Sequence, residues 1–134
     1  MLNIQDALKD FIVDEPNSNI GFLVHDEVLK KEIEKISQDR VSVSKDFAKL
    51  NLKRLPFIGE FFETIIIQDN KSILNPIVAK QLAKVIQKNR MMILITNIEV
   101  EKIQAIYEPF EFSDFSEFKI NNLNIVLLKK WFKW

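Results

Sequence analysis

The stretch that decides the fold runs from Glu63-Thr-Ile-Ile-Ile-Gln-Asp-Asn70 to Met91-Met-Ile-Leu-Ile-Thr96. Each of these two segments holds a short apolar run without alternation, which is typical of a strand buried on both faces of a parallel sheet. Turn-forming residues close the first run at Gln68 to Asn70, and Thr96-Asn97 closes the second. We therefore expect two central strands of one sheet.

The residues between these two runs predict an amphipathic helix that extends to Asn89. Asn75 is suited to cap this helix, and Pro76 is suited to its first position. Apolar side chains recur on one face at helical spacing, while lysine and glutamine cover the other face. The apolar positions are Ile77, Val78, Leu82, Val85 and Ile86. A strand, a helix and a second strand in this order indicate an α/β fold.

The N-terminal half also alternates between helix and strand. The expected elements are a helix at residues 3–13, a strand at Ile20 to Val24, a charged helix after it and a short strand around Val41 to Ser44. In the charged helix, the side chains expected to face the core are Val28, Leu29, Ile33 and Ile36. Residues 46–62 have no clean period and contain Pro56 and Gly59. There we expect a loop with one or two helical turns over the sheet edge.

The C-terminal part predicts a helix from about Ile98 to Glu108, which Pro109 ends, and then a hairpin. The hairpin strands are expected at 112–120 and 123–131, with a turn at Asn121-Asn122. The predicted fold is therefore an α/β, Rossmann-like, mainly parallel sheet with helices on both faces and an antiparallel C-terminal hairpin. We expect residues 1–134 to form a single domain.

Composition excludes several classes of function. The chain has 134 residues, a formal net charge of zero and no cysteine. The neutral balance gives no overall attraction to nucleic acid or to a membrane. The lack of cysteine removes disulfides, thiolate metal sites and cysteine nucleophiles, and it fits a cytoplasmic location. No apolar run reaches the roughly 20 residues that span a bilayer, so no membrane span is expected.

The pattern of residues 60–131 resembles the C-terminal half of class I S-adenosylmethionine-dependent methyltransferases. In that family a strand with a polar end leads to a helix, a strand, a helix and a closing antiparallel hairpin. The front departs from the family, because the strand at Ile20 to Val24 runs into His25-Asp26-Glu27 with no glycine-rich turn. The resemblance therefore implies a reduced or degenerate version. Its implied cofactor is S-adenosylmethionine, although the motif that holds it is missing.

A second resemblance is to response-regulator receiver domains. They carry acidic residues after the first strand, a phosphorylated aspartate after the third, and threonine or serine after the fourth. Asp26, Glu27, Asp69 and Thr96 occupy comparable places. The family's catalytic lysine has no match here, and the terminal hairpin is foreign to that fold.

Polar side chains follow the predicted strands at the points where the strands end. Ligands usually bind at the carboxyl edge of an open parallel sheet, so these side chains form the candidate ligand site. They are His25, Asp26, Glu27, Asp69, Asn70 and Thr96, with Asn97 beside them. Carboxylates near a histidine can hold a hard divalent cation or act as an acid–base pair. The alternative is structural: Asp26 caps the next helix, Asp69 forms a turn, and His25 is a surface residue.

The C-terminal segment combines aromatic and basic residues. Both tryptophans of the chain lie in its last four residues, with lysines beside them. The candidate interaction residues are Trp131, Phe132 and Trp134. Such a segment can anchor a protein partner or stack on nucleic-acid bases, whereas the alternative is that it packs on the core.

These observations predict a methyltransferase-like domain that is non-catalytic and binds another protein or a second copy of itself. The alternative is a small, divergent S-adenosylmethionine-dependent methyltransferase or a methyltransferase subunit. The residues assign no catalytic role, and whether the chain is an enzyme stays open at this stage.

Overall fold

The structure, a computed structural model, describes residues 19–39, 43–57, 59–68, 71–120 and 123–130. The helix expected at residues 3–13 and the turn expected at Asn121-Asn122 lie outside these ranges. The elements are β1 (Asn19–Leu23), α2 (Glu27–Asp39), β2 (Val43–Asp46), β3 (Phe62–Gln68), η1 (Lys71–Leu74), α3 (Pro76–Val85), β4 (Ile86–Ile95), α4 (Val100–Tyr107), η2 (Glu108–Phe110), β5 (Phe112–Ile120) and β6 (Leu123–Lys130).

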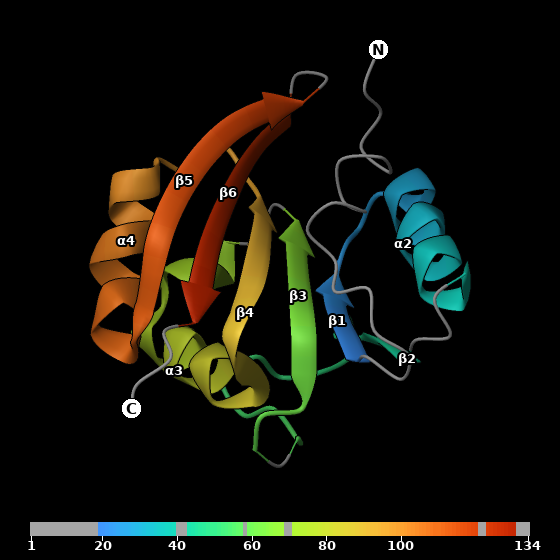
Figure 1. The fold of residues 1–134 in the computed structure, drawn as a ribbon, viewed down its shortest axis with the longest axis horizontal. Coiled ribbons are helices and arrows are strands. Elements are labelled where there is room, and N and C mark those ends of the chain that lie inside the picture. The colour runs from blue at the N-terminus through green and yellow to red at the C-terminus, as the bar shows by residue number, and fades with distance from the viewer. Residues whose placement is uncertain (1–18, 40–42, 58, 69–70, 121–122, 131–134) are drawn as a thin grey trace.

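The strands form one mixed sheet in the order β2-β1-β3-β4-β6-β5 (Figure 1). The first four strands in this order are parallel, as β1 pairs with both β2 and β3, and β3 pairs with β4. The hairpin of β5 and β6 is antiparallel and joins the sheet through β6, which lies against β4. The predicted fold class is confirmed: a mainly parallel, Rossmann-like sheet with an antiparallel C-terminal hairpin.

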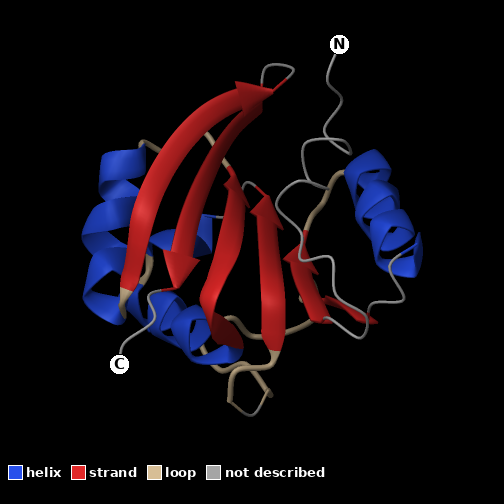
Figure 2. Ribbon diagram, viewed as in Figure 1, coloured by secondary structure: helices blue, strands red, loops and turns tan. Residues whose placement is uncertain are grey.

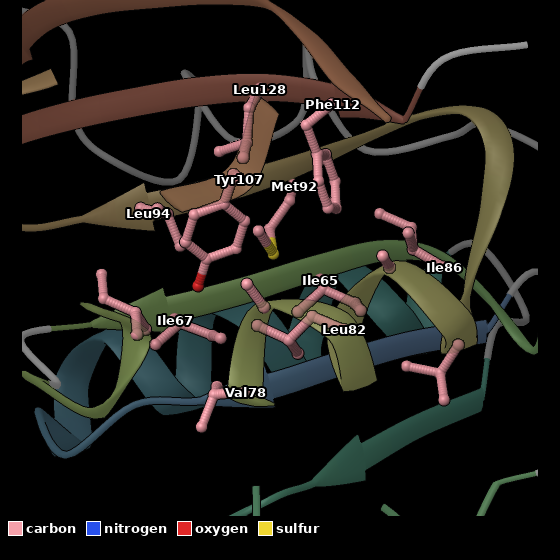
Figure 3. Close-up of a cluster of buried hydrophobic side chains, with 14 of the residues drawn as sticks. Ile65, Ile67, Val78, Leu82, Ile86, Met92, Leu94, Tyr107, Phe112 and Leu128 are labelled. Carbon is pink, nitrogen blue, oxygen red and sulfur yellow. The ribbon is translucent and has the colours of Figure 1, made fainter. Parts of the chain in front are cut away.

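Helices cover both faces of the sheet (Figure 2). On one face, side chains of α3 and α4 pack against alternate residues of β3 and β4, including Ile65 and Met92 (Figure 3). On the other face, Leu29 and Ile33 of α2 pack with Ile66 of β3. Both central strands are therefore buried on both sides, which explains their unbroken apolar runs. Within the described ranges, no helix is both long and apolar enough to cross a bilayer.

The central helix begins where the sequence predicts but ends earlier. Asn75 caps α3, and its side-chain oxygen accepts a hydrogen bond from the backbone N–H of Ile77 at 2.8 Å. The helix ends at Val85, so the predicted extension to Asn89 was wrong. Ile86 is extended and pairs with Phe62 of β3. Asn89 has a positive φ of 63°, a backbone conformation that cannot continue a right-handed helix.

Two side chains expected to face the core are exposed. Val28 of α2 is 69% exposed and Ile77 of α3 is 55% exposed, so both predictions were wrong. Each residue lies in the first turn of its helix, and the residue after it, Leu29 or Val78, is buried, so Val28 and Ile77 lie on the side of the helix that faces away from the sheet. The expected inward positions Leu29 and Ile33 are confirmed as buried, while the side chain of Ile36 is outside the description.

The irregular stretch packs on the sheet at β1, one strand inward from the edge over which it was expected. It contains two isolated turns, closed by the bonds Leu50 N–H to Phe47 O and Arg54 N–H to Asn51 O. The ring of Phe47 lies so close to β1 that a Cβ on Gly21 would clash with it. Phe47 packs in turn on Phe62 and on other rings of the same stretch. One of the two glycines of the chain is therefore required by aromatic packing and not by a ligand-binding turn.

Candidate functional site

The carboxyl edge of the parallel strands brings several polar side chains to one end of the sheet. β1, β2 and β3 end at Leu23, Asp46 and Gln68, and their registers place these ends side by side. β4 ends next to β3, at Ile95. The topology therefore forms the edge at which ligands bind in open α/β sheets.

The turn from β1 to α2 is held by Asp26. Its Oδ1 accepts hydrogen bonds from the backbone N–H groups of Val28 at 2.9 Å and Leu29 at 3.2 Å. The Asp26 N–H in turn donates to Oε1 of Gln68 at 3.2 Å. Asp26 is thus the N-cap of α2, and its carboxylate satisfies the backbone groups that an anionic ligand would otherwise use.

Asp46 at the end of β2 is also engaged by the protein. Its Oδ1 accepts from the Ala48 N–H at 2.9 Å, and its Oδ2 lies 3.0 Å from Nζ of Lys30. The hydrogen bond to Asp46, with the Coulombic attraction of that carboxylate, raises the pKa of Lys30 above its ordinary value. Lys30 lies one turn into α2, so this ion pair joins α2 to the end of β2.

A cavity of about 410 Å³ opens at this part of the edge. Two of the predicted site residues, His25 and Glu27, line it together with Lys30, Asp46 and Gln68. Asp26 does not line the cavity, because its side chain turns back onto α2. The volume lies at the lower end of the range for small-molecule sites.

Thr96 belongs to a different cavity. This second cavity, of about 570 Å³, is lined by η1 and by the turn that leads from β4 into α4. Thr96 is 4% exposed, and its Oγ1 accepts from the Ile98 N–H at 3.2 Å. Lys71 and Lys102 also line this cavity, with Glu99 as the opposing charge. The two cavities share no lining residue, so the structure does not bring Thr96 together with His25.

Several predicted residues lie outside the described ranges. These are Asp69 and Asn70 of the ligand site and Trp131, Phe132 and Trp134 of the interaction segment. Among the residues that the structure describes, no group of three or more metal-ligating side chains is arranged to hold an ion.

Sequence reasoning missed Asp46, Lys30 and Gln68. Gln68 is only 6% exposed, and the sequence signal that could have identified it is an amide directly at the end of an apolar run. Asp46 follows β1 by about 20 residues, the spacing at which dinucleotide folds place a ribose-binding carboxylate. Lys30 carries no comparable signal, since its role depends on the contact with Asp46.

Comparison with known proteins finds similar structures but no similar sequences. No family model matches the sequence, and no curated protein matches it. The structure is similar to a phosphoethanolamine N-methyltransferase of Haemonchus contortus, in complex with phosphomonomethylethanolamine and S-adenosylhomocysteine, with a TM-score of 0.68 and 8% identity. That alignment covers 92% of this chain and 51% of the other.

Two archaeal structures are similar over most of both chains. An S-adenosylmethionine-dependent methyltransferase of Methanosarcina mazei has a TM-score of 0.60 and 8% identity, covering 98% of this chain and 100% of the other. A complex of the Trm112 methyltransferase activator with a methyltransferase of Haloferax volcanii gives 0.67 and 4% identity, covering 94% and 88%. By contrast, the chain spans only 51% of the length of the Haemonchus enzyme and 65% of another similar structure, a protein of Bordetella parapertussis. The fold is therefore that of class I methyltransferases.

Proposed function

We propose that this methyltransferase-like domain is non-catalytic and acts by binding another protein or a second copy of itself. The observation that carries the proposal is the state of the carboxyl edge at β1, β2 and β3. There Asp26, Asp46 and Gln68 are all bonded to other groups of the protein. An edge whose polar groups satisfy one another offers few partners to a polar ligand.

The residues present fit S-adenosylmethionine poorly. A glycine-rich turn lets the backbone approach a nucleotide-like cofactor, but here the turn carries the side chains of His25 and Asp26. The N–H groups at the start of α2 are bonded to Asp26. The carboxylate placed to meet ribose hydroxyls, Asp46, is paired with Lys30. Binding the cofactor would require breaking these interactions.

Exposed apolar side chains support a role in binding. Val28 and Ile77 are the large hydrophobic residues of the described ranges that stand out as exposed, and they lie in the first turns of α2 and α3, which cover opposite faces of the sheet. The methyltransferase of the Haloferax complex is bound to an activator protein, a precedent for a partner on this fold. We include Trp131, Phe132 and Trp134 in the proposed interaction surface, and we propose a cytoplasmic location because the chain has no cysteine.

The alternative function is a small, divergent methyltransferase or a methyltransferase subunit. The cavity of about 410 Å³ favours it, since His25 and Glu27 project there beside Asp46. In that case Asp46 would exchange its Lys30 partner for the cofactor. The two functions differ in one measurable property, the affinity for S-adenosylmethionine.

Isothermal titration of the purified chain with S-adenosylmethionine and S-adenosylhomocysteine tests the proposal. We expect no saturable heat of binding with either compound. We also expect the molecular mass in solution to exceed that of the monomer when the chain binds a partner or a second copy of itself. Saturable binding that Asp46→Asn abolishes would establish the alternative. Asp114→Asn is the matched control, because Asp114 is an exposed carboxylate on β5, away from the carboxyl edge.

A further inference from the structure

At the opposite end of α3 from the candidate site, a basic cleft lies between that helix and the turn at η2. Its volume is about 310 Å³. Lys80 and Lys84 line one wall, one helical turn apart on α3, and Pro109 and Phe110 line the other. Lys130, the last residue of β6, closes the cleft. This cleft shares no residue with either cavity at the carboxyl edge.

The most constrained group of the cleft is the ammonium of Lys130. Lys130 is only 8% exposed. Its Nζ donates to the backbone oxygen of Phe110 at 3.0 Å, lies 3.5 Å from Oε2 of Glu111, and sits 5.6 Å from the centre of the Phe112 ring. These contacts fix a buried positive charge at the base of the cleft.

The backbone at Glu111 ends η2 in the left-handed conformation. Glu111 has a φ of 71°, in the left-handed region that favours glycine. It follows η2 directly and carries the carboxylate that faces Lys130. It is the C-cap of η2, and its N–H donates to the backbone oxygen of Glu108 at 3.1 Å, as is common where a helix ends.

The charges of the cleft are not balanced. Among the described residues that line it there are three lysines, Lys80, Lys84 and Lys130, and one carboxylate, that of Glu111, which is paired with Lys130. Lys80 and Lys84 are exposed, so their charges are available to a partner. Ala83 gives the cleft an apolar floor, and Phe110 adds apolar surface from the opposite wall. Positive walls around an apolar floor complement a segment that combines carboxylates with an apolar side chain.

We propose that this cleft binds an acidic peptide segment of a partner protein, with an aliphatic or aromatic side chain on the floor and carboxylates against Lys80 and Lys84. The proposal rests on the proposed function, because it names the chemistry of the partner that a binding domain would take. A peptide is favoured over nucleic acid, since two exposed lysines stand beside apolar side chains here, and the formal net charge of zero gives the chain no overall attraction to a nucleic-acid backbone.

An arrayed library of short fluorescent peptides, in which Glu and Asp alternate with Leu or Phe, tests the proposal against the full chain. Binding is followed by fluorescence anisotropy, with basic peptides of the same apolar content as the reference. We expect saturable binding of acidic members only, weakened about tenfold or more by the double variant Lys80→Glu/Lys84→Glu. The matched control is Lys31→Glu/Lys35→Glu, an exposed lysine pair with the same spacing on α2. It is expected to change the affinity less than twofold.

Three outcomes would overturn the proposal: no saturable binding of any acidic peptide, equal weakening by the two double variants, or tighter binding of single-stranded oligonucleotide than of peptide. Thermal melting of each variant separates lost binding from lost folding. The titration with S-adenosylmethionine is independent of this cleft. A saturable response there defeats the proposed function, while absent peptide binding alone defeats only the cleft.

Discussion

Two regions of the molecule differ in whether their polar groups have hydrogen-bond partners. At the carboxyl edge, Asp26, Asp46 and Gln68 all have partners, although this is where a ligand site is expected. In the core, Thr64 Oγ1 and Tyr107 Oη are buried and have no hydrogen-bond partner within the described ranges. Most buried polar atoms in proteins have a hydrogen-bond partner, so each atom without one calls for an explanation. Here the groups of the edge have partners, whereas two of the three buried side-chain atoms without one in the described residues lie in the core; the third is Glu32 Oε2 on α2.

The largest predicted effect concerns the packing that supports the carboxyl edge. Gly21→Ala places a methyl group against the ring of Phe47, which cannot move freely because it packs on other rings. We expect the free energy of unfolding to fall by about 3 kcal/mol, as for other overpacked cores. Urea denaturation measures it.

The other glycine is the control for this prediction. A Cβ at Gly59 meets open space, but its φ of +66° disfavours alanine. Gly59→Ala should therefore cost only about 1 kcal/mol, from the backbone alone. Equal losses at the two positions would show that the contact with Phe47 adds nothing to the cost of a side chain at position 21.

The second prediction concerns the core at Tyr107, the only tyrosine in the chain. Figure 3 shows its hydroxyl among apolar side chains, and burial there raises the pKa of Tyr107 well above its usual value. Because ionisation is easier in the unfolded chain, the stability contribution is complete below the ordinary tyrosine pKa of about 10 and is lost as pH rises above it. We expect a loss of up to about 1.4 kcal/mol per pH unit in that range.

Absorbance titration of tyrosinate, run together with denaturation at each pH, measures this effect. Tyr107→Phe should remove the part of the alkaline decline that belongs to this group, which leaves lysine deprotonation as the remainder. If wild type and variant decline in parallel above the ordinary tyrosine pKa, Tyr107 ionises as easily when folded as when unfolded. The comparison between core and edge would then lose one of its two unsatisfied groups.

The third prediction concerns the hydroxyl of Thr64. Thr64 is 1% exposed in the middle of the sheet, and its Oγ1 lacks a partner in the described chain. Thr64→Val removes the unsatisfied hydroxyl at almost constant shape and should raise the free energy of unfolding by about 1.5 kcal/mol. Thr96→Val is the control, since Thr96 Oγ1 accepts a bond from Ile98 N–H. It should lower stability by about 1 kcal/mol, and the same sign for both variants would contradict the contrast.

The sequence predicts the elements of this fold well because the strongest patterns are local. The apolar runs of β3 and β4 and the Asn75-Pro76 start of α3 each follow from neighbouring residues. The end of α3 depends instead on pairing between Ile86 and Phe62, a contact across 24 positions that periodicity does not register. The exposure of Val28 and Ile77 depends on which side of each helix start packs against the sheet, since Leu29 and Val78 beside them are buried.

The sequence predicted where the candidate site lies but not which of its residues contact one another. Parallel strands put His25, Glu27 and Gln68 at one cavity, as the carboxyl-edge rule requires. Thr96 follows the same rule but opens into another cavity, because the turn after β4 leads into α4 on the opposite face from α2. The pairing of Lys30 with Asp46 joins two elements across the edge, and it changes the edge from a candidate ligand site to a satisfied structure.

The smallest predicted effect distinguishes a structural from a ligand-binding role for Asp26. If its carboxylate only caps α2, Asp26→Ala should lower the free energy of unfolding by about 1 kcal/mol, while Asp26→Asn, also a good cap, should change it by a few tenths. Residues kept for a ligand commonly behave in the opposite way, and their removal raises stability. Thermal and urea denaturation of both variants measure the difference. If Asp26→Ala raises stability, the carboxylate of Asp26 is unfavourable in the folded chain, and the carboxyl edge is again a candidate ligand site.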